Sequence, residues 1–319
     1  AGVSASYSFI GGGTTNTINS SLAFIGGGGG NNISTAAAQY ATIGGGAGNT
    51  VSNQYSTVAG GQDNNVSGSR STVGGGFNNT VTQPFSHIGG GNSNSVSGSR
   101  ATIGGGDLNS VTGDSGVIGG GSGNAANGRT STIGGGNSNT TIGLSSTVSG
   151  GASNTANGIT STVSGGTNNQ ANGQLSTVSG GESNTASVRA STVAGGSGCT
   201  AGDLYSFATG LGTVTGNGVN GSAAFGTYNV YTGTLGGSSR IFMVGGGTSG
   251  SPGNVFSITT AGGVYVPVGG SYNSTGADYA EYFENTDGTA LPIGTSVAFT
   301  GSDRKIKVAT PSDVPFGVV

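Results

Sequence analysis

The one tight group of acidic side chains in this sequence is formed by Asp278, Glu281 and Glu284. Neighbouring carboxyl groups can donate and accept protons as a general acid and base, so this group is a candidate for catalysis. In the alternative interpretation the same spacing makes a short helical turn, in which the acids face solvent and the aromatic residues between them pack inward. The sequence leaves both interpretations open.

The chain contains one histidine, His87, and one cysteine, Cys199. A metal site of ordinary type needs several such ligands, so the sequence predicts no metal site and no cofactor. We expect His87 to face solvent, and the alternative is a meeting of its copies on a symmetry axis. We expect Cys199 to be a small packed residue, with a cross-chain disulfide as the alternative, because one cysteine forms no disulfide within a single chain.

The composition is far from that of an ordinary globular domain, with 72 glycines in 319 residues and only 6% charged residues. Disorder usually combines low hydrophobicity with high net charge, whereas this chain has a net charge of −3 and a strict pattern. The six prolines are too few for collagen. No glycine run is followed by Gly-Lys-Ser/Thr, so these runs are not phosphate-binding loops.

Two partner classes are excluded by composition. Only eight basic residues and an isoelectric point near 4.8 leave no basic footprint for nucleic acid. No segment approaches the ~18 consecutive apolar residues of a membrane span.

A sequence repeat sets the secondary structure of most of the chain. A β-branched residue recurs every 15 residues from Ile10 onward, apart from one step of 18 between Ile25 and Ile43. The predicted structural core is this column: Ile43, Val58, Val73, Ile88, Ile103, Ile118, Ile133, Val148, Val163, Val178 and Val193.

Asparagine keeps the same step, six residues after each core residue. It tolerates left-handed backbone, and its amide can bond to its own backbone or to the asparagine one coil away. The predicted turn ladder is Asn49, Asn64, Asn79, Asn94, Asn109, Asn124, Asn139, Asn154, Asn169 and Asn184. A second apolar column lies eight residues after the first and changes from valine, as at Val66, to alanine, as at Ala156. We therefore expect a thinner core toward the C-terminus.

Each unit reads as a strand, a Gly-Gly turn, a second short strand and another turn. Side chains alternate faces along a strand, so Ser71 and Val73 should point inward and Thr72 outward. The sequence therefore predicts an all-β fold, a parallel β-roll of ~15-residue coils.

A single stack of such coils is expected to need identical partners. About two small apolar side chains in each coil bury little area, and the cost of ordering the chain is larger. Bundling copies around an axis would let one column bury more area. The sparse apolar content thus favours a homo-oligomer without giving its copy number.

The repeat, for instance Ser-Thr-Val-Ser-Gly-Gly-Ala-Ser-Asn-Thr-Ala-Asn-Gly over 146–158, resembles the head repeats of trimeric autotransporter adhesins, which also occur in phage tail fibres. The resemblance covers about residues 1–226. It implies β-rolls that form only as trimers, hence a homotrimer.

The end of the chain resembles another family. Gly-Ala-Asp-Tyr-Ala-Glu-Tyr-Phe-Glu over 276–284, followed by Leu-Pro-Ile-Gly over 291–294 and Phe-Gly-Val-Val over 316–319, looks like the opening of the G2-type self-cleaving intramolecular chaperone of phage neck appendages and tail fibres. The resemblance implies self-cleavage in the assembled trimer, with Asp278, Glu281 and Glu284 as its candidates. Because that domain normally runs further, we expect at most a remnant of this activity and no other enzyme.

Together these features predict a β-roll shaft at 1–204, an irregular roll-to-neck section at 205–270 and a β-rich cap at 271–319, a partial chaperone-like domain. We expect an extracellular fibre protein, a homotrimeric rod for host attachment on a virion, with cell-surface glycans or a host receptor as its other partner. The alternatives are a bacterial trimeric surface adhesin head and an ice-binding β-solenoid. The latter presents two threonine columns on one face, whereas this repeat has one.

Overall fold

The computed structural model describes residues 2–3, 6–232 and 238–266, together with the backbone of three later strands at 296–299, 306–308 and 317–318. The chain divides into two compact units, 1–269 and 270–319. The described residues form strands and turns and contain no helix. The prediction of an all-β fold is therefore confirmed.

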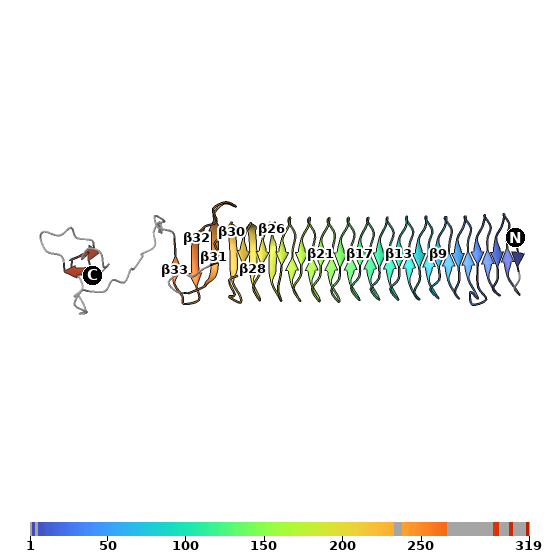
Figure 1. Cartoon of the computed structure of the whole chain (residues 1–319), viewed down its shortest axis with the longest axis horizontal. Coiled ribbons are helices and arrows are strands. Elements are labelled where there is room, and N and C mark those ends of the chain that lie inside the picture. Colours follow the sequence, from blue (N-terminus) through green and yellow to red (C-terminus); the bar gives the residue numbers. More distant parts are fainter. Residues whose placement is uncertain are drawn as a thin grey trace. The chain divides into compact units, whose positions relative to one another are not determined.

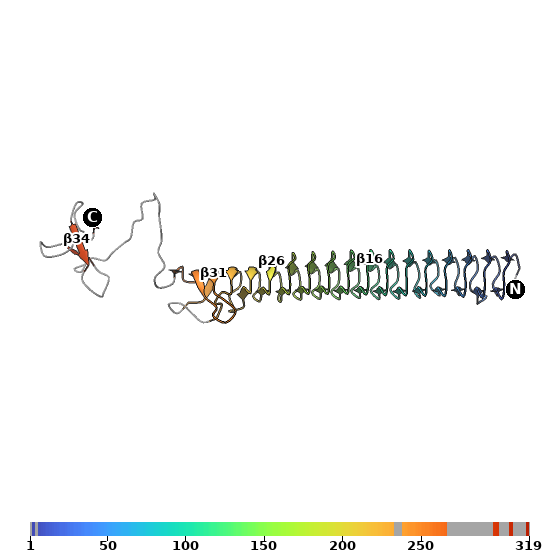
Figure 2. The ribbon, with the colours of Figure 1, turned by 90° about the horizontal axis from the view of Figure 1, so that it is seen from above.

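The first unit is a stack of coils whose short strands form two parallel sheets. Figure 1 shows the strands of successive coils side by side along one axis, and Figure 2, turned by 90°, shows the two sheets as separate rows. Sheet A has 15 strands. They are β1 (Gly2–Val3), β3 (Thr17–Ile18), β5 (Asn32–Ile33), β7 (Thr50–Val51), β9 (Asn65–Val66), β11 (Thr80–Val81), β13 (Ser95–Val96), β15 (Ser110–Val111), β17 (Ala125–Ala126), β19 (Thr140–Thr141), β21 (Thr155–Ala156), β23 (Gln170–Ala171), β25 (Thr185–Ala186), β27 (Thr200–Ala201) and β29 (Val214–Thr215).

Sheet B holds the first core column and continues beyond the regular coils. Its strands are β2 (Phe9–Ile10), β4 (Phe24–Ile25), β6 (Thr42–Ile43), β8 (Thr57–Val58), β10 (Thr72–Val73), β12 (His87–Ile88), β14 (Thr102–Ile103), β16 (Val117–Ile118), β18 (Thr132–Ile133), β20 (Thr147–Val148), β22 (Thr162–Val163), β24 (Thr177–Val178), β26 (Thr192–Ser197), β28 (Phe207–Leu211), β30 (Ala223–Thr227), β31 (Arg240–Gly246), β32 (Asn254–Thr259) and β33 (Val264–Tyr265).

The sequence repeat sets the register of both sheets. Val73 pairs with Ile88 in sheet B, one 15-residue step along the chain. The one 18-residue step keeps the same pairing, since Ile25 lies opposite Ile43, so its extra residues fall outside the strands. The prediction of stacked, parallel ~15-residue coils is confirmed.

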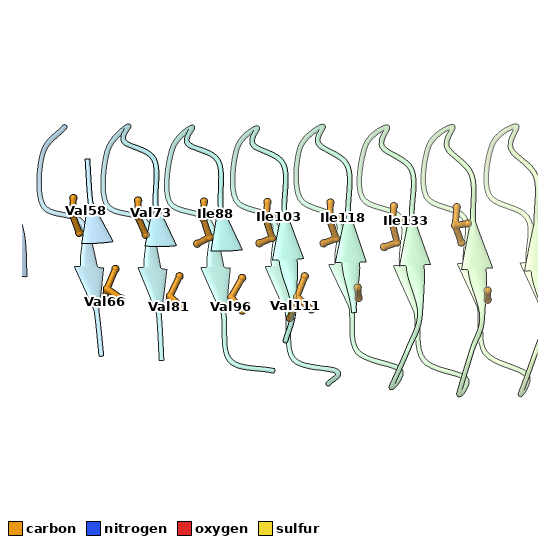
Figure 3. Close-up of a cluster of buried hydrophobic side chains, with 14 of the residues drawn as sticks. Val58, Val66, Val73, Val81, Ile88, Val96, Ile103, Val111, Ile118 and Ile133 are labelled. Carbon is orange, nitrogen blue, oxygen red and sulfur yellow. The ribbon is translucent and has the colours of Figure 1, made fainter. Parts of the chain in front are cut away.

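The core lies between the two sheets. Figure 3 shows Val58, Val73 and Ile88 in one row and Val66, Val81 and Val96 in the facing row. All of the residues of the predicted core column, from Ile43 to Val193, have no exposed surface within one chain. The coil is closed at its two corners by buried polar side chains, as with Ser71 and Asn79.

This closure corrects one step of the sequence argument. The sparse apolar columns were expected to need neighbouring chains for their burial, and that is wrong, because the facing sheet of the same chain covers them completely. Buried serine and asparagine side chains fill the rest of the interior and satisfy the backbone there. The homotrimer stays a prediction that a single chain does not test.

The asparagines form a continuous buried ladder along one corner. The side-chain amide of Asn79 donates to the carbonyl of Gly75 in its own coil and to that of Gly91 in the next, both at 2.9 Å. Its backbone N–H donates to Oδ1 of Asn64, 3.0 Å away in the preceding coil. Each amide thus connects three coils, and no polar atom of the ladder needs water.

The backbone at this corner differs from the expectation. The left-handed residue is not the asparagine but the one before it, such as Asn78 with φ of 56° or Ser93 with φ of 54°. A glycine also lies three residues after each core residue. Gly121 has φ of 89°, and a Cβ added there would lie 2.1 Å from the carbonyl oxygen of Gly136. Only glycine fits this position, for conformation and for space.

The side chains of the second core column become smaller toward the C-terminal half, as the sequence predicts. Val111 is followed in sheet A by Ala126, Thr141 and Ala156, all of them fully buried. The Thr141 hydroxyl donates to Oγ of Ser131 at 2.8 Å across the interior. A polar residue is tolerated there because the coil supplies its partner.

Beyond the regular coils, residues 205–232 and 238–266 extend sheet B with longer intervals between strands. Strands β28, β30 and β31 still run parallel, and the hairpins from β31 to β33 are antiparallel. Asp203 is buried and accepts hydrogen bonds from the backbone of Gly218 at 2.9 Å and from the Ser222 hydroxyl at 3.0 Å. Its carboxylate therefore fixes the loop before β30. The three segment boundaries proposed from the sequence stay predictions.

In the second unit the described strands are β34 (Ser296–Phe299), β35 (Ile306–Val308) and β36 (Gly317–Val318). They form an antiparallel sheet in the order β35-β34-β36. Among all described residues, no helix is long and apolar enough to cross a membrane.

Candidate binding and assembly surfaces

The acidic group Asp278, Glu281 and Glu284 lies outside the described residues. Its role in self-cleavage stays a prediction. In the part of the chain that the structure describes, no three His, Cys, Asp or Glu side chains gather as metal ligands would.

The other two candidate residues lie in the coils. His87 is exposed on β12, in the outward column otherwise made mainly of threonine. Cys199 is fully buried at the ladder position that asparagine holds in earlier coils. Its N–H donates to Oδ1 of Asn184 at 2.9 Å, and its thiol lies 3.1 Å from the carbonyl of Gly210. The cysteine therefore ends the asparagine ladder as a packed residue.

One corner of the stack carries a row of large exposed side chains. It lies in the turn that leads from sheet A back to sheet B, three residues before each core residue. We define the arginine–aromatic ladder as the five residues that occupy this position in successive coils: Tyr40, Tyr55, Arg70, Phe85 and Arg100. Tyr40, Tyr55 and Phe85 are each about half exposed, at 47%, 49% and 51%.

The ladder's side chains stack on one another along the rod. The rings of Tyr40 and Tyr55 are nearly parallel, with centroids 4.9 Å apart. The Arg70 guanidinium carbon lies 5.3 Å from the Tyr55 ring and 5.5 Å from the Phe85 ring. On the far side of Phe85, the guanidinium of Arg100 lies 5.7 Å from its centroid. These are cation–π distances, so each guanidinium is attracted to a ring face.

The backbone holds these side chains in register. All five have left-handed backbone with φ between 55° and 61°. The N–H of Arg70 donates to the carbonyl of Gln54 at 3.0 Å, and that of Phe85 to the carbonyl of Ser69 at 3.0 Å. From Tyr55 to Arg100, each ladder residue is bonded in this way to the corner of the preceding coil. The ladder is therefore part of the rigid stack rather than a set of loop side chains.

Positive charge gathers at the turn that carries the arginine–aromatic ladder. Arg70, Arg100, Arg129 and Arg189 are the basic residues of the regular 15-residue coils, and all lie in the turn from sheet A to sheet B. The acids Asp63, Asp107 and Glu182 lie in the other turn, and Asp114, on the arginine edge, accepts a hydrogen bond from the backbone of Ser99 at 2.9 Å. Among the described residues, no ion pair joins Arg70 or Arg100 to an acid.

The outward face of sheet B is narrow and polar along most of its length. It carries the threonine column of strands such as β10 and β14, and the next outward position is a small residue. This residue is a glycine in most coils, as at Gly74 and Gly104, and an alanine or serine in the others, as at Ala59 and Ser149. A Cβ at Gly74 would lie 2.3 Å from the carbonyl oxygen of Gly89. This face therefore has one threonine column beside a column of glycine, alanine and serine, and lacks the paired threonines of an ice-binding face.

The same face becomes apolar at its C-terminal end. We define the phenylalanine row as Phe207, Phe225, Phe242 and Phe256, on β28, β30, β31 and β32. Successive ring centroids lie 5.4, 5.3 and 6.0 Å apart. All four side chains are only partly buried. Phe207 continues the threonine column, since it pairs with Thr192, and Phe242 lies in the same column through Ala223, whereas Phe225 and Phe256 lie in the neighbouring outward column.

Sequence reasoning missed the arginine–aromatic ladder. A signal was present, because Tyr55, Arg70, Phe85 and Arg100 follow one another at intervals of 15 residues. Periodic apolar residues indicate a core, whereas arginine and tyrosine at a turn give no such indication.

The comparison with protein families gives one match. Residues 237–319 match the Peptidase_G2 model, described as the IMC autoproteolytic cleavage domain. The match covers the end of the first unit, from the strand β31 onward, and the whole second unit. It supports the resemblance found in the 276–319 sequence. No curated protein matches the chain.

Proposed function

We propose that this chain is the shaft and C-terminal part of a virion fibre, a homotrimeric rod that holds a host-binding surface away from the particle. This proposal is supported mainly by one combination, a long stack of coils together with a match to a self-cleaving, chaperone-type domain at 237–319. A stack of identical coils supplies length and stiffness without a catalytic pocket. The site of action is extracellular, on the virion surface.

The phenylalanine row supports assembly at the C-terminal end of the shaft. Its four rings contact one another in tilted or edge-on pairs and keep part of their surface exposed. A sheet face that only met solvent would not need so large an apolar patch. In a cyclic assembly the same patch of every copy faces a neighbour. We therefore assign this row to the contact between chains, and its last two members, Phe242 and Phe256, lie within the region that matches the cleavage domain. The copy number of three comes from the resemblance of the coils to trimeric head repeats.

The test is the mass of the intact assembly under native conditions, before and after boiling in detergent. We expect three times the chain mass of 30.1 kDa before boiling and the single-chain mass afterwards. A native mass equal to one chain would refute the trimeric rod.

Attachment is tested separately, with labelled full-length protein and cells of candidate hosts. A bacterial surface adhesin head would share the coils, and the match at 237–319 favours the virion fibre. Detection of the protein in purified virions supports this choice, and its detection on bacterial cells in the absence of virus contradicts it.

A further inference from the structure

We propose that the arginine–aromatic ladder is a binding site for an acidic polysaccharide, an extended sugar chain in which carboxylate-bearing units alternate with uncharged ones. This inference gives the ligand class of the attachment fibre proposed above and rests on that function.

The two neighbouring rings hold the Arg70 guanidinium in an orientation that can bind a planar anion. Tyr55 and Phe85 lie at 5.3 and 5.5 Å from its guanidinium carbon, one ring on each side. A guanidinium between two rings keeps its N–H donors free at its rim, and this planar fork matches the two oxygens of a carboxylate. Because the side chain is already held, little conformational freedom is lost when the ligand binds.

The spacing of the charges indicates a linear ligand. Arg70 and Arg100 are two coils apart, with Phe85 in the coil between them. Adjacent strands lie ~4.8 Å apart, so the two guanidiniums repeat at about 10 Å along the edge. Between them, the half-exposed Phe85 ring offers an apolar edge to the C–H groups of an uncharged sugar. The hydroxyls of Tyr40 and Tyr55 add hydrogen-bonding groups at one end.

Two other linear ligands, DNA and an extended peptide, fit this edge poorly. Double-stranded DNA carries one charge per ~1.7 Å and is bound by a dense basic surface, whereas the coils contain four arginines in all. A peptide that binds as an added strand needs an unpaired sheet edge. Strands β10 and β12 beside the ladder are paired on both sides. A polysaccharide needs neither a dense charge nor a strand edge.

The experiment measures binding of the full-length protein to a soluble polymer of alternating glucuronic acid and N-acetylglucosamine. The matched control ligand is the same polymer with its carboxyl groups reduced to alcohols. We expect binding to the acidic polymer, weakening as salt increases, and no binding to the reduced polymer. Equal binding to both polymers, or to neither, overturns the proposal.

Variants locate the site. Arg70→Ala combined with Arg100→Ala should weaken binding by about tenfold or more, as expected for the loss of charge-assisted hydrogen bonds. Arg129→Ala is the control, because Arg129 is an exposed arginine on the same edge without a stacked ring among the described contacts. Equal losses in both variants overturn the assignment to the ladder.

A second double variant tests the site if the alanine variant does not fold. If the alanine variant unfolds, Arg70→Lys with Arg100→Lys keeps the charge and removes the planar fork, and binding should fall several-fold. Unchanged binding in the folded lysine variant refutes the proposal. A change in the native mass of either variant identifies the edge as a contact between copies and also refutes the proposal.

Cell attachment separates this proposal from the proposed function. Attachment that persists in a variant unable to bind the polymer refutes only the role of the ladder. Wild-type protein that attaches to no host cell refutes the proposed function.

Discussion

The side-chain amide of Asn94 donates a hydrogen bond to Oδ1 of Asn79, 3.1 Å away and one coil earlier, and neither side chain is exposed. The same amide also donates to the carbonyls of Gly90 at 3.1 Å and Gly106 at 2.8 Å. The ladder therefore depends on donors that only an amide can supply at this position.

Replacing Asn94 by aspartate should strongly destabilise the first unit. The variant Asn94→Asp loses both amide donors and places a carboxyl group where no water reaches, so we expect the free energy of unfolding to fall by at least about 2 kcal/mol at neutral pH. Burial raises the pKa of the introduced carboxyl, which makes folding favour its protonated form. Relative to wild type, stability should therefore decrease as the pH rises from about 4 toward 8.

Chemical denaturation at several pH values measures this effect. The control is Asn78→Asp, one residue before the ladder position of its coil, exposed and left-handed, which should change stability by less than about 0.5 kcal/mol. Equal effects of the two substitutions would contradict the role assigned to the buried amides.

Two neighbouring glycines should respond differently to alanine. Gly121 has φ of 89°, and its Cβ would meet the Gly136 carbonyl, so Gly121→Ala should cost about 2 kcal/mol or more. Gly120 has no atom within 4 Å of an added Cβ, and Gly120→Ala should change stability by less than about 0.5 kcal/mol. Thermal unfolding followed by circular dichroism compares them. A larger loss for Gly120→Ala than for Gly121→Ala would show that the corner geometry is misassigned.

Truncating a core side chain should create a cavity that the coil cannot close. Ile103 is fully buried, and we expect Ile103→Ala to lower the free energy of unfolding by about 2–5 kcal/mol. Val117, on the next strand of sheet B, points outward and is 38% exposed. Val117→Ala should cost less than about 1 kcal/mol. Denaturant titrations check both values, and a small effect at Ile103 is the contradictory result.

The phenylalanine row should control assembly more than folding. Phe225→Ser combined with Phe242→Ser removes two adjacent rings that are only partly buried within one chain. We expect a native mass equal to a single chain, with the β-sheet circular dichroism signal kept. Phe77→Ser, at an exposed turn, should leave the mass of the assembly unchanged. A row variant that still assembles like wild type rules out this contact.

The role of the acidic group at 278–284 in self-cleavage can be tested by removing its carboxyl groups. In a longer precursor that contains this sequence, Asp278→Asn combined with Glu281→Gln should prevent self-cleavage if the carboxyl groups transfer protons during peptide-bond breakage. Denaturing gel electrophoresis after assembly reports the two fragments. Asp63→Asn is the control, since Asp63 lies in a turn of the shaft. Unchanged processing of the double variant supports the alternative, in which these acids only face solvent.

The sequence was sufficient to predict the coil because the periodic residues alone set it. Val73 and Ile88 are one repeat apart in the sequence and adjacent in sheet B. Burial by one chain was not foreseen, since the contribution of Ser71 and Asn79 to the interior follows from hydrogen bonds that a hydropathy pattern does not contain. The arginine–aromatic ladder escaped prediction because it depends on side chains brought together at a turn. Arg70 and Phe85 contact each other only once the corner of each coil is left-handed.

The alignment of the strand hydrogen bonds with the axis of the first unit has a mechanical consequence. Bonds such as that from Gly74 N–H to the carbonyl of Ile88, at 2.9 Å, join one coil to the next, so a pull on the two ends of the unit stretches them directly instead of shearing them. Such a rod should yield by peeling off its coils one after another, each releasing about 50 Å of extended chain. In the fibre proposed above, a pull on the end bound to a cell would lengthen the rod coil by coil. The particle at the other end would be slowed gradually, and the fibre would not break at a single load.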